Sequence, residues 1–221
     1  MPDLADSFGD KMSDDFLWRD GDLRAMNKLL LKSRGDIEMK MAITLFYSHW
    51  EGHFKFCAEQ LLSFMSEGVR RKVFKWTEFR PDIRSRILFC GYRRSSISGQ
   101  NQATFLEYLN ALNDSRYSQC LDAKDDVIMV DDNLNTTRAD AICRNLGMDS
   151  KWFIMKKVII DERLVSHRNA IAHGSRRLRS GDEMDFSNPD LRDTIDIVHG
   201  LIRQTRVEFS NFASIRGFIV K

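Results

Sequence analysis

Proline is scarce in this chain, with three residues among 221. Because proline interrupts helices, whereas the abundant Leu, Met, Glu, Lys and Arg favour them, the composition predicts a mostly helical fold. No apolar run approaches the ~18 residues that are needed to cross a bilayer. The acidic start of the chain, with Asp3 and Asp6, also lacks the basic and then apolar regions of a signal peptide. These absences predict a soluble, cytoplasmic protein with no membrane partner.

Cysteine and net charge are also low. The four cysteines lie roughly thirty residues apart without a Cys-x-x-Cys pair, which suits neither a zinc site nor a disulfide scaffold. We therefore expect buried thiols in a reducing compartment at Cys57, Cys90, Cys120 and Cys143. Lys and Arg exceed Asp and Glu by only two residues, so a strongly basic coat is excluded and local clusters must supply any affinity for RNA.

Two groups of residues have a spacing that suits a metal ion, but each lacks further ligands. His49 and His53 are four residues apart on an expected helix, and no third ligand accompanies them. The acidic pairs at 125–126 and 131–132 fall in an expected loop, where Asp is an ordinary turn residue. No glycine-rich phosphate cradle is present beside them. We expect no metal and no cofactor.

Capping residues and hydrophobic periodicity predict the main helices. A first helix starts near Ser13 and ends before Gly35, and a second runs from Asp36 to about Ser66. A third long helix is capped by Asp149 or Ser150 and ends at residues 173–174, and a last helix begins at Pro189. The core helices therefore cover about 13–66 and 150–215.

The middle of the chain, about 70–147, is expected to elaborate this bundle, because no flexible linker borders it. Short helices are predicted from Pro81 to Arg94, over 102–113 and over 137–146, with Gly147 as a stop signal. Residues 127–130 suit a short extended segment. We therefore expect one domain over 1–221.

The last helix carries an apolar stripe with heptad spacing. Its members are Leu191, Ile195, Val198, Ile202, Thr205, Phe209 and Phe212. Such a stripe either packs inside a bundle or forms a seam with a second chain. We expect it to pack inside the bundle.

The most informative run covers residues 164–174. On a helix, Asn169 and His173 are four residues apart and share a face, and Glu162 and Ser166 continue the same stripe. Arg168 lies to one side with a long side chain that can reach over the stripe. A histidine that titrates near neutral pH and a permanently charged guanidinium suit a phosphate ester, with proton transfer by one and charge stabilisation by the other. The alternative is structural, since His and Gly commonly end helices.

Arg168, Asn169 and His173 resemble the signature of the HEPN superfamily (higher eukaryotes and prokaryotes nucleotide-binding). In that signature an Arg, often followed by Asn, precedes a His with four to six residues between them. Trp50-Glu51-Gly52 resembles the second helix of the HEPN branch that carries Trp-Glu-Gly. A third resemblance is Asn133-Leu134-Asn135, followed by Leu146-Gly147.

The resemblance implies an all-α, HEPN-type helical bundle. It also implies a metal-independent endoribonuclease, in which the RNA 2′-hydroxyl attacks the adjacent phosphorus and leaves a 2′,3′-cyclic phosphate. Members are commonly face-to-face homodimers, and many are toxins of toxin–antitoxin pairs or parts of phage defence, so a cognate antitoxin is a possible partner. The alternative is a non-catalytic module that binds RNA, nucleotides or another protein.

The expected site centres on the motif residues. His173 would move the proton, Arg168 would neutralise charge on phosphorus, and Asn169 would position the phosphate or the imidazole, with Ser166 on the same stripe. Glu51, beside Trp50 on a buried helix, needs a partner, and Arg168 is the candidate; the alternative is an exposed Glu with no role. The expected RNA contacts are Arg176, Arg177 and Arg179.

Further basic clusters are weaker candidates for the same role. These are residues 70–72 and 93–94, with Trp76 or Tyr92 available to stack on a base. Charge runs of this kind are more often solvated faces.

Overall fold

The structure is a computed structural model that describes residues 4–32, 35–97, 110, 127–128, 133–178, 180–186 and 189–220. No β-strand occurs in these ranges, and the fold is all-α as predicted. The helices are α1 (Leu4–Lys32), α2 (Asp36–Arg70), α3 (Pro81–Ile97), α6 (Thr136–Leu146), α7 (Lys151–Ile154), a π-helix (Val158–Val165), α8 (Ser166–Ala172) and α9 (Pro189–Ser214). A short 3₁₀ turn covers Trp76–Glu78.

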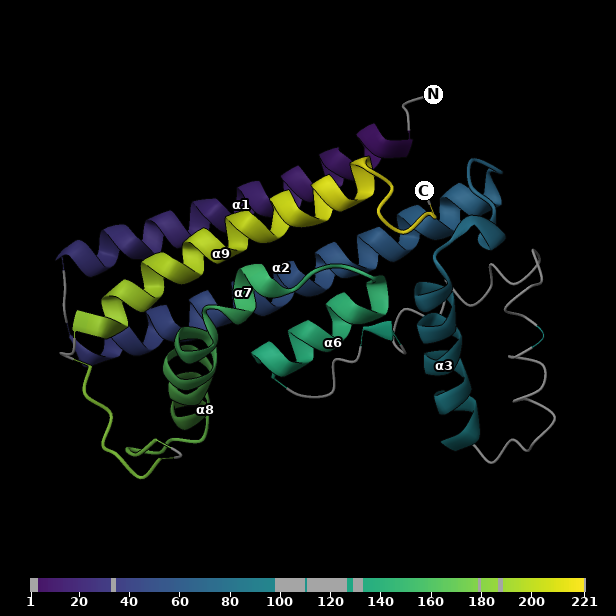
Figure 1. The fold of residues 1–221 in the computed structure, drawn as a ribbon. Helices are drawn as coiled ribbons and strands as arrows, with labels where there is room; N and C mark the ends of the chain where they lie inside the picture. The colour runs from purple at the N-terminus through teal and green to yellow at the C-terminus, as the bar shows by residue number, and fades with distance from the viewer. Residues whose placement is uncertain are drawn as a thin grey trace.

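Three long helices, α1, α2 and α9, form the bundle (Figure 1). Each of them packs against the other two. On the other side of α2 lie the short helices, of which α6, α8 and the π-helix contact α2 directly. Figure 1 shows α8 and α6 beside one another below α2, and α3 at the far end of the molecule. The motif residues therefore lie on a layer of short helices that a long central helix supports.

The middle of the core is aromatic. The ring of Phe54 on α2 lies 5.4 Å from Trp50, 5.8 Å from Phe153 and 5.6 Å from Phe209, measured between centroids. All four side chains are fully buried. Because Phe153 comes from α7 and Phe209 from α9, this cluster joins the layer of short helices to the bundle.

The apolar stripe of α9 faces this core. Leu191, Ile195, Val198, Ile202 and Phe209 are buried, and the hydroxyl of Thr205 bonds to the carbonyl of Leu201 in its own helix. Phe212 is partly buried against the same cluster. The stripe therefore packs inside the bundle, as expected from the sequence.

A buried polar network joins α1 to α2. Asp15 accepts hydrogen bonds from Arg19 Nε at 2.8 Å and from His53 Nδ1 at 2.6 Å, and His53 is fully buried. Burial would raise the pKa of Asp15, but the hydrogen bonds from His53 and Arg19 lower it below its usual value. The imidazole of His53 is thus hydrogen-bonded to a carboxylate of α1. No cluster of three or more metal-ligating residues occurs in the described ranges.

Most helix boundaries agree with the sequence, and two do not. α1 begins at Leu4 rather than near Ser13, because Phe8 and Met12 extend its buried stripe toward the N-terminus. The single helix expected from residue 150 to 173 is broken into α7, the π-helix and α8. The starts of α2 and α3, at Asp36 and Pro81, were predicted correctly.

Several expectations fall wholly or partly outside the described residues. These are the helix over 102–113, both acidic pairs and Cys120. Of the expected extended segment 127–130, Val127 is helical and Ile128 lies in a bend. The three described cysteines, Cys57, Cys90 and Cys143, are buried thiols, as predicted. Among the described helices, none combines the length and the apolar character that a membrane span requires.

Gly147 ends α6 in the left-handed conformation, with a φ of 75°. Gly147→Ala is expected to lower the free energy of unfolding by about 1–2 kcal/mol, because this conformation strains an L residue. An added Cβ would also lie 2.4 Å from Ile83 Cδ1. Urea denaturation followed by circular dichroism measures the change.

Gly200→Ala is the matched control for this substitution. Gly200 is helical and exposed in α9, and nothing lies within 4 Å of a Cβ added there. Alanine should therefore raise the free energy of unfolding by about 0.5–1 kcal/mol. Changes of the same sign in both variants would contradict the role assigned to Gly147.

Candidate functional site

A groove with a volume of about 810 Å³ lies where α6, the π-helix, α8 and the loop after α8 meet. Its walls combine amides, hydroxyls, cations and one carboxylate with a few apolar side chains. The lining residues are Asn133, Asn135, Thr137, Arg138, Lys157, Asp161, Val165, Ser166, Asn169, Ala170, His173, Ser175, Arg177 and Leu178. Four of the predicted site residues, Ser166, Asn169, His173 and Arg177, are among them.

The π-helix sets which side chains face this groove. The N–H of Ser166 bonds to the carbonyl of Asp161, five residues earlier, so one turn contains an additional residue. Asp161 therefore lies on the same side of the helix as Ser166, Asn169 and His173. Glu162, which an uninterrupted α-helix would place on this stripe, is exposed and does not line the groove. The stripe expected from the sequence is correct within α8 and wrong across the π-helix.

His173 lies at the C-terminus of α8, where it is exposed to solvent. Its backbone N–H bonds to the carbonyl of Asn169 at 3.0 Å. The chain then turns away through Gly174, which has a φ of 64°. The helix end thus presents the imidazole at the groove, one turn beyond the half-buried Asn169.

Arg168 lies behind the groove wall. Its Nη1 donates to Asn133 Oδ1 at 2.5 Å and to Asn169 Oδ1 at 3.1 Å, and both acceptors line the groove. The guanidinium carbon is 4.6 Å from the centroid of the Tyr47 ring, in a cation–π contact. Arg168 therefore joins two groove residues to α2 rather than projecting freely into the groove.

Two buried aromatic side chains of α2 hold the segment 133–135 in place. The Tyr47 hydroxyl accepts from Leu134 N at 2.9 Å and donates to Asn133 Oδ1 at 3.3 Å. The Trp50 indole donates to Leu134 O at 3.4 Å. Burial, and next the nearby Glu51 carboxylate, raise the pKa of Tyr47 well above its usual value, so the hydroxyl keeps the proton that it donates. Trp50 thus supports the site through the backbone.

Glu51 does not form the expected pair with Arg168. Its carboxylate instead binds Lys55 Nζ at 2.7 Å, one turn along α2, and both side chains are partly exposed. Arg168 is held by amide oxygens and an aromatic face. The contact predicted between Glu51 and Arg168 was wrong because a lysine on the same helix is the nearer cation.

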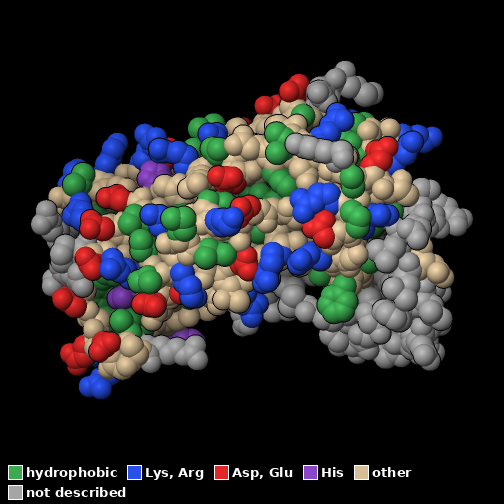
Figure 2. Space-filling model, viewed as in Figure 1, with side chains coloured by type: hydrophobic (Ala, Val, Ile, Leu, Met, Phe, Trp, Pro, Cys, Tyr) green, Lys and Arg blue, Asp and Glu red, His purple; other side chains and the backbone are tan. Residues whose placement is uncertain are grey.

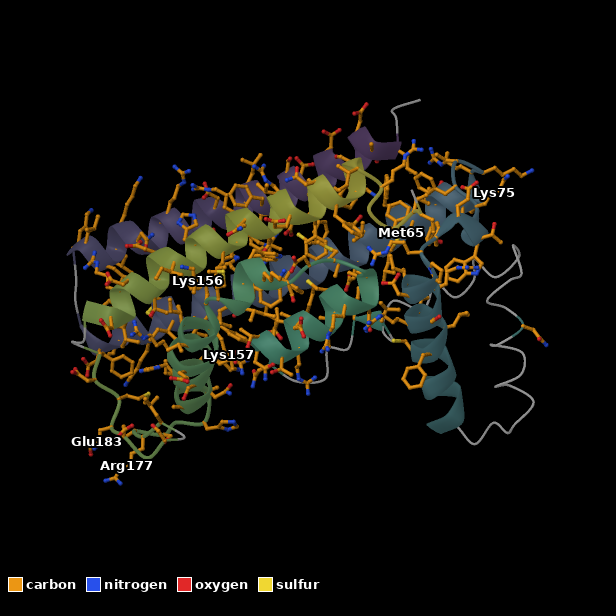
Figure 3. The ribbon with its side chains drawn as sticks, viewed as in Figure 1. Met65, Lys75, Lys156, Lys157, Arg177 and Glu183 are labelled. Carbon is orange, nitrogen blue, oxygen red and sulfur yellow. The ribbon has the colours of Figure 1, made fainter. Side chains whose placement is uncertain are left out.

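The groove is basic although the whole chain is nearly neutral. Among the described residues, Arg138, Lys157 and Arg177 line it, against the one carboxylate of Asp161. Burial would raise the pKa of Asp161, but hydrogen bonds from Lys157 and Thr136 lower it. Figure 3 shows Lys157 beside α6 and α8, and Arg177 in the loop beyond α8. Elsewhere on this face, cationic and anionic side chains are interspersed (Figure 2).

The three arginines expected to contact RNA differ in position. Arg177 lines the groove, is exposed, and lies 4.0 Å from Glu183 across the loop. Arg176 is exposed but does not line the groove. Arg179 lies outside the described residues. Only Arg177 is therefore placed against the groove in the described part of the loop.

Trp76, a candidate for base stacking, and His167, which the sequence did not single out, are both buried. Trp76 is fully buried, so the base stacking considered for it is wrong. His167, next to the motif arginine, is buried, and burial lowers the pKa of its imidazole. Its position suits packing and not proton transfer in the groove. Arg70 and Arg71 bind Glu67, and the side chains of residues 92–94 lie outside the described part.

Sequence reasoning missed five residues that build this site. Tyr47 and Asn133 hold Arg168, and Arg138, Lys157 and Asp161 line the groove. Asn133 belongs to the Asn133-Leu134-Asn135 motif that the sequence analysis noted, but no role in the site was predicted for it. Lys157 and Asp161 carried no such signal, because only the π-helix and the turn before it bring them to the groove.

Comparison with known families agrees with this architecture. The family model described as RiboL-PSP-HEPN matches residues 14–211. The chain belongs to this HEPN family, as its motifs indicated. Comparisons with curated proteins and with solved structures gave no match.

Tyr47→Phe is expected to lower the free energy of unfolding by about 1–3 kcal/mol. The change leaves the ring under Arg168 but removes the hydroxyl that accepts the hydrogen bond of the buried Leu134 N–H. Equilibrium denaturation in urea measures the loss. Ser48→Ala, which removes an exposed hydroxyl bonded only to Thr44 O of the same helix, should change stability by less than about 0.5 kcal/mol. Equal stability of the two variants would show that the Tyr47 hydroxyl does not hold the segment 133–135.

Proposed function

We propose that this protein is a metal-independent endoribonuclease that cleaves RNA in the groove beside α8. The observation that carries the proposal is the exposed imidazole of His173 at a basic groove, one turn from Asn169, with Arg168 bound to the same asparagine. Membership of the HEPN family supports it, since that family includes ribonucleases.

The reaction needs one proton acceptor and one proton donor. The RNA 2′-oxygen forms a bond to the adjacent phosphorus while the bond from phosphorus to the 5′-oxygen breaks. The proton of the 2′-hydroxyl passes to a base, and a proton is delivered to the departing 5′-oxygen. We assign one of these transfers to His173, because its imidazole is exposed and lines the groove, and an imidazole can accept or donate a proton. The products are a 2′,3′-cyclic phosphate and a 5′-hydroxyl.

Arg168 and Asn169 act on the phosphate as a unit. Because Asn169 Oδ1 accepts from Arg168, the Nδ2 of Asn169 is the donor that remains for a phosphate oxygen. The guanidinium behind it places a fixed positive charge close to the charge that develops on phosphorus. Lys157, Arg138 and Arg177 then attract the backbone on either side.

We further propose that the protein works in the cytoplasm as a homodimer and as a toxin or phage-defence effector. A face-to-face dimer would bring two copies of His173 and Arg168 to one cleft, and a cognate antitoxin would cover it. Family membership is the support for this step.

A module that binds RNA or nucleotides without cleaving them is the second candidate. The same basic groove favours it, because binding needs the cations but not the imidazole. Recruitment of a protein through the stripe of α9 is a weaker candidate, since that stripe is buried. Detection of the cyclic phosphate separates cleavage from binding.

His173→Ala and Arg168→Ala are each expected to slow cleavage of single-stranded RNA by at least about 100-fold. The measurement is the initial rate on a labelled oligonucleotide, with the cyclic phosphate identified by mass spectrometry. Arg168→Lys keeps the charge but not the planar fork, and should recover only part of the loss. EDTA should leave the rate unchanged.

The control for this experiment is Arg176→Ala, an exposed arginine outside the groove. It should cleave at close to the wild-type rate. Undiminished cleavage by His173→Ala, with a wild-type melting curve, would reject the catalytic assignment.

Arg177→Ala should weaken RNA binding and reduce its dependence on salt. If Arg177 neutralises one phosphate, the slope of log affinity against log salt should fall by about 0.7 for a single strand. Arg176→Ala removes the same charge from the adjacent residue and should leave the slope unchanged. Fluorescence anisotropy at several salt concentrations, in the His173→Ala background, measures both. Identical slopes for the two variants would show that Arg177 does not contact the RNA backbone.

A further inference from the structure

A second, smaller cavity of about 300 Å³ adjoins the groove. The two share three residues on the first turn of α6 and its cap, Asn135, Thr137 and Arg138. The smaller cavity then continues along α6 to Ala141, Ile142 and Asn145, and is closed by Val127. A ligand in the groove therefore has a side opening next to it, at the lower limit of the volume range of small-molecule pockets.

The walls of this side pocket differ from those of the groove. Val127 and Ile142 are almost fully buried and, with Ala141, give it an apolar floor. The amide of Asn145 is oriented by its Nδ2, which donates to Val127 O at 3.1 Å. Its Oδ1 is then the remaining acceptor on that wall. Among the described residues that line this pocket, the one cation is the half-buried Arg138, at the shared boundary.

We propose that the side pocket binds one nucleobase of the RNA whose backbone occupies the groove. This inference rests on the proposed function, because it requires RNA in the groove. A flat base with an apolar face and polar edges fits apolar walls that carry one fixed amide, whereas a phosphate would find its cation only at the boundary. RNA-binding proteins commonly receive unstacked bases of single strands in this way, on apolar or guanidinium surfaces. The pocket would then determine which nucleotide lies next to the cleaved bond.

The test measures binding of short single-stranded RNAs that each lack one base. In the His173→Ala protein, removal of the base at one position should weaken binding by about tenfold, while removal elsewhere has a smaller effect. Ala141→Leu fills the pocket without a change of charge. It should weaken binding of the intact RNA to the level of that one abasic RNA, and should leave the abasic RNA unaffected. Ala5→Leu, at an exposed position of α1 remote from the groove in sequence and fold, is the control and should change neither.

The outcomes separate this inference from the proposed function. If wild-type protein cleaves RNA but every abasic RNA binds equally, the side pocket is not a base site and the nuclease stands. If removal of one base weakens binding and Ala141→Leu abolishes this difference, the side pocket is a base site. This conclusion holds even when wild-type protein forms no cyclic phosphate. Absence of any RNA binding overturns the inference. Competition between a mononucleotide and the RNA in the wild-type protein, but not in Ala141→Leu, would also support base recognition.

Discussion

The site depends on the attachment of segment 133–135 to α2. Tyr47 and Trp50 bind both backbone groups of Leu134 from within the core, and the same tyrosine carries Arg168 on its ring. Asn133 then binds Arg168, and Arg168 binds Asn169. A chain of contacts therefore runs from fully buried aromatic side chains to an amide at the groove. Side chains held in this way lose little freedom when they bind a ligand, which favours precise positioning.

The π-helix is the second constraint on the groove. Because Ser166 bonds to the residue five positions earlier, the Asp161 carboxylate is brought to the wall, where it accepts hydrogen bonds from Thr136 at the start of α6. Lys157 binds the same carboxylate and also lines the groove. The contact of Asp161 with Thr136 thus joins the π-helix to α6, with Lys157 beside it. Without the additional residue in the turn, Glu162 would face the groove, and the connection to α6 would be lost.

The fold could be predicted from the sequence to a large extent, because its signals are local. Residues such as Asp36, Pro81 and Gly147 mark helix ends through their nearest neighbours, and the starts of α2 and α3 and the end of α6 were predicted correctly, although the N-cap of α2 is Gly35 and not Asp36. The order of the motif residues within α8 followed from helical periodicity alone. The start of α1 was missed because Phe8 and Met12 are buried only by packing against distant residues.

The parts of the site that could not be predicted are non-local. Helical spacing already offers Lys55, four residues after Glu51, as the partner of that carboxylate. Only the three-dimensional arrangement brings Asn133 and Tyr47 to Arg168. The π-helix changes register without a proline or glycine to mark it. Side chains beyond such a turn cannot be assigned to a face by counting.

Local charge matters more than net charge for the chemistry of this molecule. An excess of two positive charges over the whole chain gives little attraction at a distance of more than a Debye length, about 8 Å at physiological salt. In the described part of the groove, three cations surround one carboxylate, and that carboxylate is bound by Lys157 and Thr136. RNA would therefore be attracted mainly after it reaches the groove, where the imidazole of His173 is exposed. Under the proposed function, the shape of the groove and of the pocket beside it would select the RNA more than a long-range field would.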